Sequence, residues 1–180
     1  MMSKIIVFIA LGFGLLIVSC DGKPTLQQYF VKNQSEKSFI SMDVSPDILK
    51  LDPTKLSKEE AKALASFDKM NVLAFKINPK NKGSYQLEKD KVVEILKDTT
   101  EYHQLMKFGS GGAGASISFV GDENHINEFV LFGNKKENGF AVVRILGNDM
   151  KPENAMQLFS ILQKSNINGK DLSVFEDMIK

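Results

Sequence analysis

Cys20 is the only cysteine in this 180-residue sequence, and it follows closely on an apolar run at residues 5–18. A thiol can act as a nucleophile, a metal ligand or one half of a disulfide. With a single cysteine, the chain can form no internal disulfide, zinc finger or CxxC redox site. The residues that precede Cys20 indicate which of the remaining roles of a thiol applies.

The residues before Cys20 resemble the lipobox of bacterial lipoprotein signals, where an aliphatic, a variable and a small residue precede an obligatory cysteine. Ile17, Val18 and Ser19 stand in those places. As a helix, the run at residues 5–18 would cover about 21 Å, which is short of the about 30 Å hydrocarbon core of a bilayer. It matches the apolar region of a secretory signal. The resemblance implies cleavage between Ser19 and Cys20, with a diacylglycerol on the new terminal cysteine.

These features divide the chain into three parts. Residues 1–19, with Lys4 as the basic start, are predicted to be a lipoprotein signal peptide. Residues 20–24 form a short lipid-anchored tether, which extends at most about 17 Å. Residues 25–180 form a single α+β domain. We expect an exported protein held at a membrane, the outer membrane of a Gram-negative cell, facing the periplasm or the surface.

The charge balance argues against nucleic-acid binding. Lys4 leaves with the signal, so 23 − 1 = 22 basic residues face 22 acidic ones. Nucleic-acid binding needs a concentrated basic face. Arg144 is the only arginine, and we expect it at an edge or on an outward face. An inward arginine would need a carboxylate partner, and the sequence singles out none.

Two further patterns could do chemistry. Residues 109–114 fit the letters of GxGxxG, but an alternating strand pattern at residues 115–119 follows them instead of a helix. A phosphate site needs that helix N-terminus, so we expect a flexible loop between strands, usable at most as an adaptable lip. Asp98, Thr99 and Thr100 resemble a periplasmic O-glycosylation sequon of some Gram-negative bacteria, which makes Thr99 a weak candidate. A turn that ends a helix is the alternative.

Asp122, Glu123, Asn124 and His125 are the densest set of metal-ligand side chains. One histidine beside two carboxylates, without a spaced partner, is typical of a solvated turn. His103 is expected on a sheet face. No catalytic, cofactor-binding or metal-binding residue is assigned, and no cofactor is expected.

Hydrophobic periodicity predicts an α+β two-layer sandwich, in which a mixed, mostly antiparallel sheet of about five to six strands carries helices on one face. The segment at residues 70–77 is apolar enough for a central strand buried on both faces. In the helix that begins at Ser57, Ala61, Leu64 and Ala65 are expected to face inward. Helices are predicted at residues 25–33, 57–67, from the loop at 78–83 to about 97, from 152 onward and at 171–179. Strands are predicted at residues 38–44, 70–77, 102–108, 115–120, 128–132 and 140–146.

Residues 26–162 resemble the lipoprotein family called domain of unknown function 4252. The likeness is carried mostly by core positions: residues 26–30, 39–42, 48–49, 72–73, 102–106, 127–131 and 146–148. It implies export, lipid anchoring and an α+β domain without an assigned reaction. The glycine-rich segment at residues 109–114 departs from the family pattern.

The leading interpretation is a membrane-anchored envelope protein that binds a partner protein, peptide or small ligand without catalysis. Two alternatives stay open. One is a hydrolase or carbohydrate-active enzyme in which His103, His125, Asp122 and Glu123 converge. The other is a sensory or stress-linked envelope lipoprotein.

Overall fold

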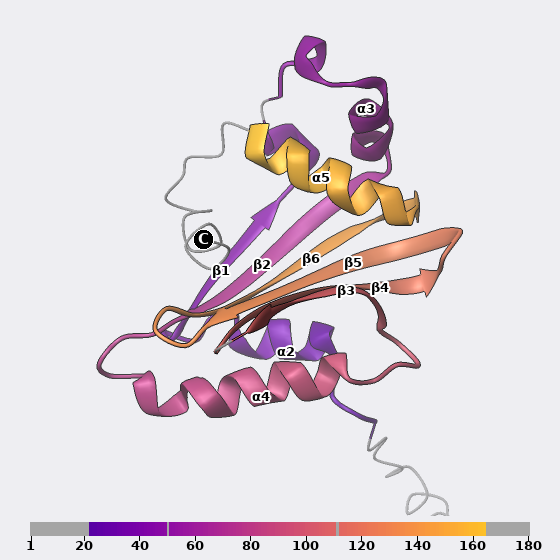
Figure 1. Ribbon diagram of the computed structural model, residues 1–180. Coiled ribbons are helices and arrows are strands. Elements are labelled where there is room, and N and C mark those ends of the chain that lie inside the picture. The colour runs from indigo at the N-terminus through magenta and orange to yellow at the C-terminus, as the bar shows by residue number, and fades with distance from the viewer. Residues whose placement is uncertain (1–21, 50, 111, 165–180) are drawn as a thin grey trace, which may run out of the picture.

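A computed structural model describes residues 22–49, 51–110 and 112–164 (Figure 1). The predictions for residues 1–19, for Cys20 and for a helix at 171–179 lie outside this part of the chain. The elements follow in the order α2 (Leu26–Asn33), β1 (Phe39–Val44), η1 (Pro46–Leu49), η2 (Pro53–Lys55), α3 (Lys58–Ala65), β2 (Phe67–Lys76), η3 (Lys82–Ser84), α4 (Tyr85–Leu96), β3 (His103–Ser110), β4 (Ala113–Asp122), β5 (His125–Lys135), β6 (Gly139–Met150) and α5 (Pro152–Lys164).

The six strands form one sheet in the order β1-β2-β6-β5-β4-β3. Every neighbouring pair is antiparallel, and β1 and β3 are the edges. The predicted α+β class and strand number are therefore confirmed, and the sheet, predicted to be mixed and mostly antiparallel, is antiparallel between all its described strands. None of the described helices has the length and hydrophobicity needed to cross a membrane.

Helices cover both faces of the sheet: α3 and α5 lie on one side, α2 and α4 on the other (Figure 1). This differs from the expected placement on one face. The central strands explain the difference, since Val72, Leu73, Ala74 and Phe75 are consecutive and all at most 5 % exposed. Successive strand side chains point to opposite faces, so both faces need an apolar cover. The predicted two-sided burial of this strand is confirmed.

Each helical layer encloses its own core. The cluster on the α3 and α5 side includes Met70, Val143 and Leu158. The cluster on the α2 and α4 side includes Phe75 and Phe140, whose rings stack with centroids 5.5 Å apart.

The two short helices α2 and α3 each begin with a capping box. In α2, Thr25 caps the helix and Gln28 completes the box, and Leu26, Tyr29, Phe30 and Asn33 are buried.

In α3 the capping box of Ser57 and Glu60 is present, but the inward face differs from the expected one. Ala61 and Ala65 are exposed and Ala63 is buried. The Glu60 carboxylate accepts a hydrogen bond of 2.8 Å from the Ser160 hydroxyl of α5, so this side of the helix lies against α5.

Candidate functional site

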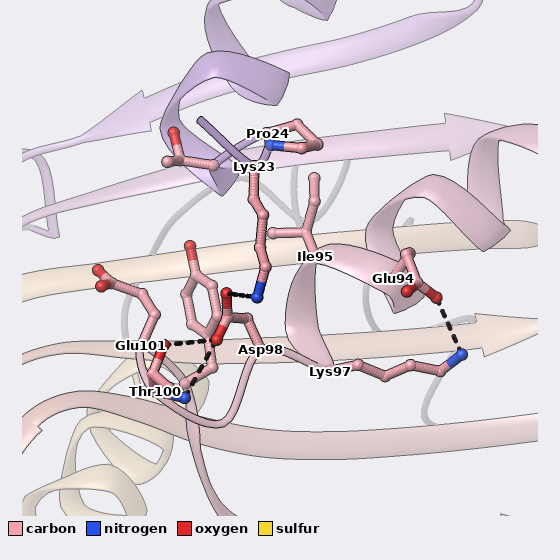
Figure 2. Close-up of a pocket in the computed structure, with 10 residues that line it drawn as sticks. Lys23, Pro24, Glu94, Ile95, Lys97, Asp98, Thr100 and Glu101 are labelled. Atoms are coloured by element: carbon pink, nitrogen blue, oxygen red, sulfur yellow. Dashed lines mark hydrogen bonds and ion pairs between the residues drawn. The ribbon is translucent and has the colours of Figure 1, made fainter. Parts of the chain in front are cut away.

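A pocket of about 390 Å³ opens where the tether enters the domain, between residues 23–25 and the connection from α4 to β3 (Figure 2). Its lining combines charged side chains with the apolar residues Pro24 and Ile95. The lining residues are Lys23, Pro24, Thr25, Glu94, Ile95, Lys97, Asp98, Thr100, Glu101 and Tyr102. Sequence reasoning missed this site, because its two walls are far apart in the chain and neither carries a recognisable motif.

Asp98 shapes the wall that follows α4. Its Oδ1 atom accepts hydrogen bonds from the Thr100 hydroxyl at 2.6 Å and the Thr100 backbone N–H at 3.1 Å. Its Oδ2 atom accepts a hydrogen bond of 3.0 Å from Lys23 Nζ, which joins the tether end to this loop. The Thr100 hydroxyl, and after it the Lys23 ammonium, lowers the pKa of Asp98 to about 2. Asp98 is therefore a permanent anion in the pocket wall.

The other charges divide into one ion pair and one free group. Lys97 Nζ lies 3.0 Å from Glu94 Oε2, and both side chains are largely exposed. Among the described residues, the Glu101 carboxylate has no hydrogen-bond or ion-pair partner. Two lysines and three acids give the lining a net charge of 2 − 3 = −1.

Tyr102 connects the pocket to helix α2. Its hydroxyl oxygen accepts a hydrogen bond of 3.2 Å from the Leu26 backbone N–H, one of the donors that a helix N-terminus leaves free. The Tyr102 side chain is only 6 % exposed, and burial is the main cause that raises its pKa. The start of α2, and with it the tether end, is thereby fixed to the rim of the sheet.

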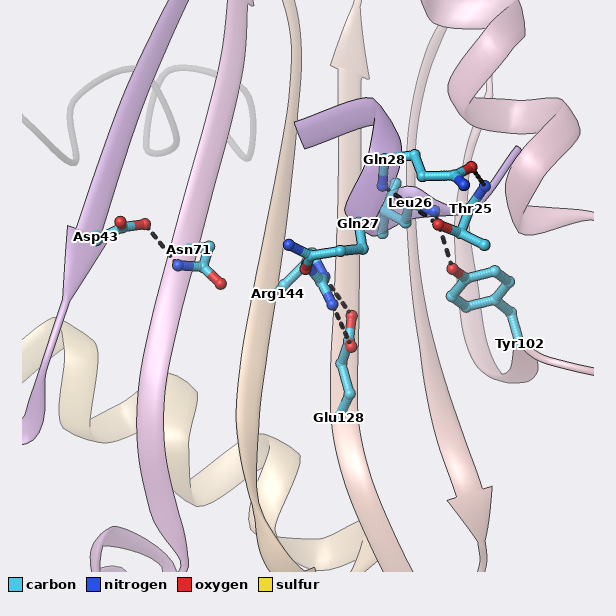
Figure 3. Close-up of polar contacts among 9 residues, drawn as sticks. All are labelled: Thr25, Leu26, Gln27, Gln28, Asp43, Asn71, Tyr102, Glu128 and Arg144. Atoms are coloured by element: carbon cyan, nitrogen blue, oxygen red, sulfur yellow. Dashed lines mark hydrogen bonds and ion pairs between the residues drawn. The ribbon is translucent and has the colours of Figure 1, made fainter. Parts of the chain in front are cut away.

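Beneath α2 lies an ion pair between Arg144 of β6 and Glu128 of β5 (Figure 3). Arg144 Nε and Nη2 donate to the two Glu128 carboxylate oxygens at 2.7 and 2.8 Å. Arg144 Nη1 donates to the Gln27 side chain, and the guanidinium lies 5.5 Å from the centre of the Phe30 ring. The Arg144 and Glu128 side chains are only 8 % and 11 % exposed.

The expected outward placement of Arg144 was therefore wrong. The physical reason is that α2 covers this part of the sheet, while the neighbouring strand supplies the carboxylate that a buried arginine requires. The pairing of β5 with β6 sets Arg144 opposite Val130, two residues from Glu128.

The four residues of the enzyme interpretation do not form one site. The His103 ring lies 5.2 Å from that of Phe119 on the neighbouring strand. His125 Nδ1 is 3.4 Å from Asp122 Oδ1 in an exposed turn. Asp122 also accepts hydrogen bonds from the backbone N–H groups of Asn124 and His125, which is a turn-forming role. In the described part of the chain, no group of three or more His, Cys, Asp or Glu side chains could hold a metal ion.

The glycine-rich segment joins two strands, as predicted, but less of it is loop than expected. Residues 109–110 and 113–114 belong to β3 and β4, and Gly109 pairs with Gly114 across the hairpin. Gly109 has φ +126°, and a Cβ there would overlap the backbone of the opposite strand. Thr99 is exposed in the turn after α4, between the two residues whose hydrogen bonds shape the pocket wall.

Comparison with known proteins identifies a family. A family model described as "Domain of unknown function (DUF4252)" matches residues 30–158, which is more than half of the chain. No curated protein and no solved structure matches the sequence.

Proposed function

This chain belongs to the DUF4252 family, and from that premise we propose that it is a lipid-anchored protein of the bacterial envelope. Its domain works as a non-catalytic binding module, and the pocket at the tether end is the binding site. The observation that carries this proposal is that Lys23 and Pro24, at the end of the tether, and Thr25, the first residue of the domain, form one wall of the pocket.

The position of this wall relative to Cys20 gives the pocket its role. Lys23 is three residues from Cys20, a span of at most about 11 Å. A lipid on Cys20 therefore keeps the pocket within that span of the anchor point. Two or more acyl chains, such as palmitate, would make the attachment stable, whereas one chain gives only marginal binding. The proposed location of the protein is the outer membrane of a Gram-negative cell.

The chemistry of the pocket supports binding more than catalysis. A general acid or base works best with a pKa near the operating pH. Asp98, with a pKa of about 2, stays ionised at neutral pH and so cannot donate a proton. Lys23 and Lys97 each have a carboxylate partner at 3.0 Å.

Thr99 stands on the exposed side of the same loop, where a glycosyltransferase could reach its hydroxyl.

The anchor is tested by expressing the full chain in a Gram-negative host with an alkyne analogue of palmitate. We expect label on the processed protein and a diacylglyceryl cysteine at its amino terminus by mass spectrometry. Cys20→Ser should lose the label and accumulate as the precursor. Ser19→Ala is the matched control, because alanine keeps the small residue before the cysteine. An unprocessed wild-type chain, or a free thiol at position 20, would refute the anchor.

The binding role is tested by a photo-crosslinking amino acid in intact cells. Placed at Lys97 on the pocket rim, it should give an adduct with a ligand or partner. The control position is Lys62, which is exposed on α3 at the opposite face of the sheet. Equal crosslinking at both positions would show that the pocket is not the binding site.

A further inference from the structure

We propose that the tether-end pocket receives the phosphoethanolamine headgroup of a phospholipid from the bilayer that holds the anchor. This inference rests on the proposed function, since the lipid on Cys20 is what places the pocket next to phospholipid headgroups. Glu101 binds the headgroup ammonium, and Lys23 together with Lys97 binds its phosphate.

The free carboxylate of Glu101 determines the cationic part of the ligand. It is exposed, lines the pocket, and brings the net charge of the lining to −1. A primary ammonium carries three N–H donors and can form charge-assisted hydrogen bonds with a carboxylate. The quaternary ammonium of choline has no N–H donor and is recognised instead by open aromatic faces. Among the described residues of the lining, Tyr102 is the only aromatic one, and it is just 6 % exposed, so the pocket favours ethanolamine over choline.

Lys23 and Lys97 determine the anionic part of the ligand. Among the described residues, Lys23 Nζ is bonded to Asp98 alone, and its side chain is 81 % exposed. Lys97 has one contact, to Glu94, and its side chain is 66 % exposed. Each ammonium has three donors, so both retain N–H groups that can turn toward a phosphate. Cations and a free carboxylate thus line one cavity, as a zwitterionic ligand requires.

The dimensions and the tether agree with this occupant. The cavity volume of about 390 Å³ lies in the range of small-molecule sites, about 300–1,000 Å³. Only two residues separate Lys23 from Cys20, so the headgroup layer is the ligand source nearest to the pocket. A tether of this length keeps the local ligand concentration at about millimolar or above, so a weak contact suffices. A bound headgroup would fix the domain in one orientation on the membrane.

The test is a titration of the purified full-length lipoprotein in lipid-free detergent micelles, followed by NMR at the backbone amides of residues 98–102. The probes are glycerophosphoethanolamine, glycerophosphocholine and glycerophosphoglycerol. We expect the first to bind about fivefold more tightly than the other two, the gain available from one exposed charge contact. Glu101→Gln should remove this preference. Glu59→Gln, an exposed site on the opposite helical layer, should keep it.

Equal affinity for the three probes, or an unchanged preference in Glu101→Gln, would overturn the headgroup assignment. Preferred binding of ethylamine without a phosphate would overturn it as well. The probes are soluble, so their binding does not depend on the acyl chains. If the chain is not lipidated, the proposed function is refuted. If the chain is lipidated but does not bind glycerophosphoethanolamine preferentially, only this inference is refuted.

Discussion

Glu128→Leu should be among the most damaging single substitutions in the described domain. In the wild type, both Glu128 oxygens accept from Arg144, at 2.7 and 2.8 Å, in a site where neither side chain is more than 11 % exposed. Leucine fills a similar space but leaves the guanidinium without its counter-charge. Arg144 keeps its contacts with the Gln27 side chain and the Phe30 ring.

The expected loss follows from these contacts. Removing one partner of a buried ion pair costs about 3–5 kcal/mol, because an uncompensated charge stays buried. The contacts to Gln27 and Phe30 place Glu128→Leu at the lower end of that range, about 3 kcal/mol. A single domain has a free energy of unfolding of about 5–15 kcal/mol, so this loss is a large share of the total.

Urea unfolding followed by far-ultraviolet circular dichroism measures this change. Lys97→Met, which breaks the exposed pair with Glu94, is the control and should cost less than about 0.5 kcal/mol. The double variant Glu128→Leu with Arg144→Met should recover most of the loss, because well-packed apolar side chains often replace a buried pair without cost. A single-variant loss below about 1 kcal/mol, or a double variant as unstable as the single one, would refute the reasoning.

Two further predictions concern the pocket. Tyr102→Phe leaves the Leu26 N–H without its acceptor and should lower the free energy of unfolding by about 1–3 kcal/mol in urea titrations; an unchanged midpoint would contradict the role of this bond. The Asp98 carboxyl should titrate in NMR with a pKa of about 2, and Thr100→Val should raise that pKa more than Lys23→Met does, because the Thr100 hydroxyl is the larger cause. Since folding lowers this pKa from 3.8, the contribution of Asp98 to stability is present above about pH 4 and is lost as the pH falls toward 2. A midpoint near 3.8 in the folded protein, or a larger effect of Lys23→Met, would contradict this assignment.

Local signals in the sequence sufficed for most of the elements. The buried face of α2 follows from the helical spacing of Leu26, Tyr29 and Phe30, and its start from Thr25. Such patterns depend on neighbours a few residues away, which the sequence shows directly. The faces of the sheet on which the helices lie were harder to predict from the sequence. The consecutive apolar residues of β2 nevertheless already required an apolar cover on each face. Two-sided burial of one strand and helices on a single face were therefore incompatible expectations.

The burial of Arg144 is a feature that the sequence alone did not predict. The turn at Asn138 and Gly139 fixes the β5–β6 register, so antiparallel geometry alone predicts that Arg144 and Glu128 lie close together. The burial of this pair could not be predicted in the same way, because it depends on Gln27 and its helix, 117 residues earlier in the chain. The pocket has the same origin, since its walls meet only after α2 has docked on Tyr102. Both features therefore depend on one event, the packing of the segment directly after the tether, and a substitution that loosens α2 should weaken the ion pair and the pocket together.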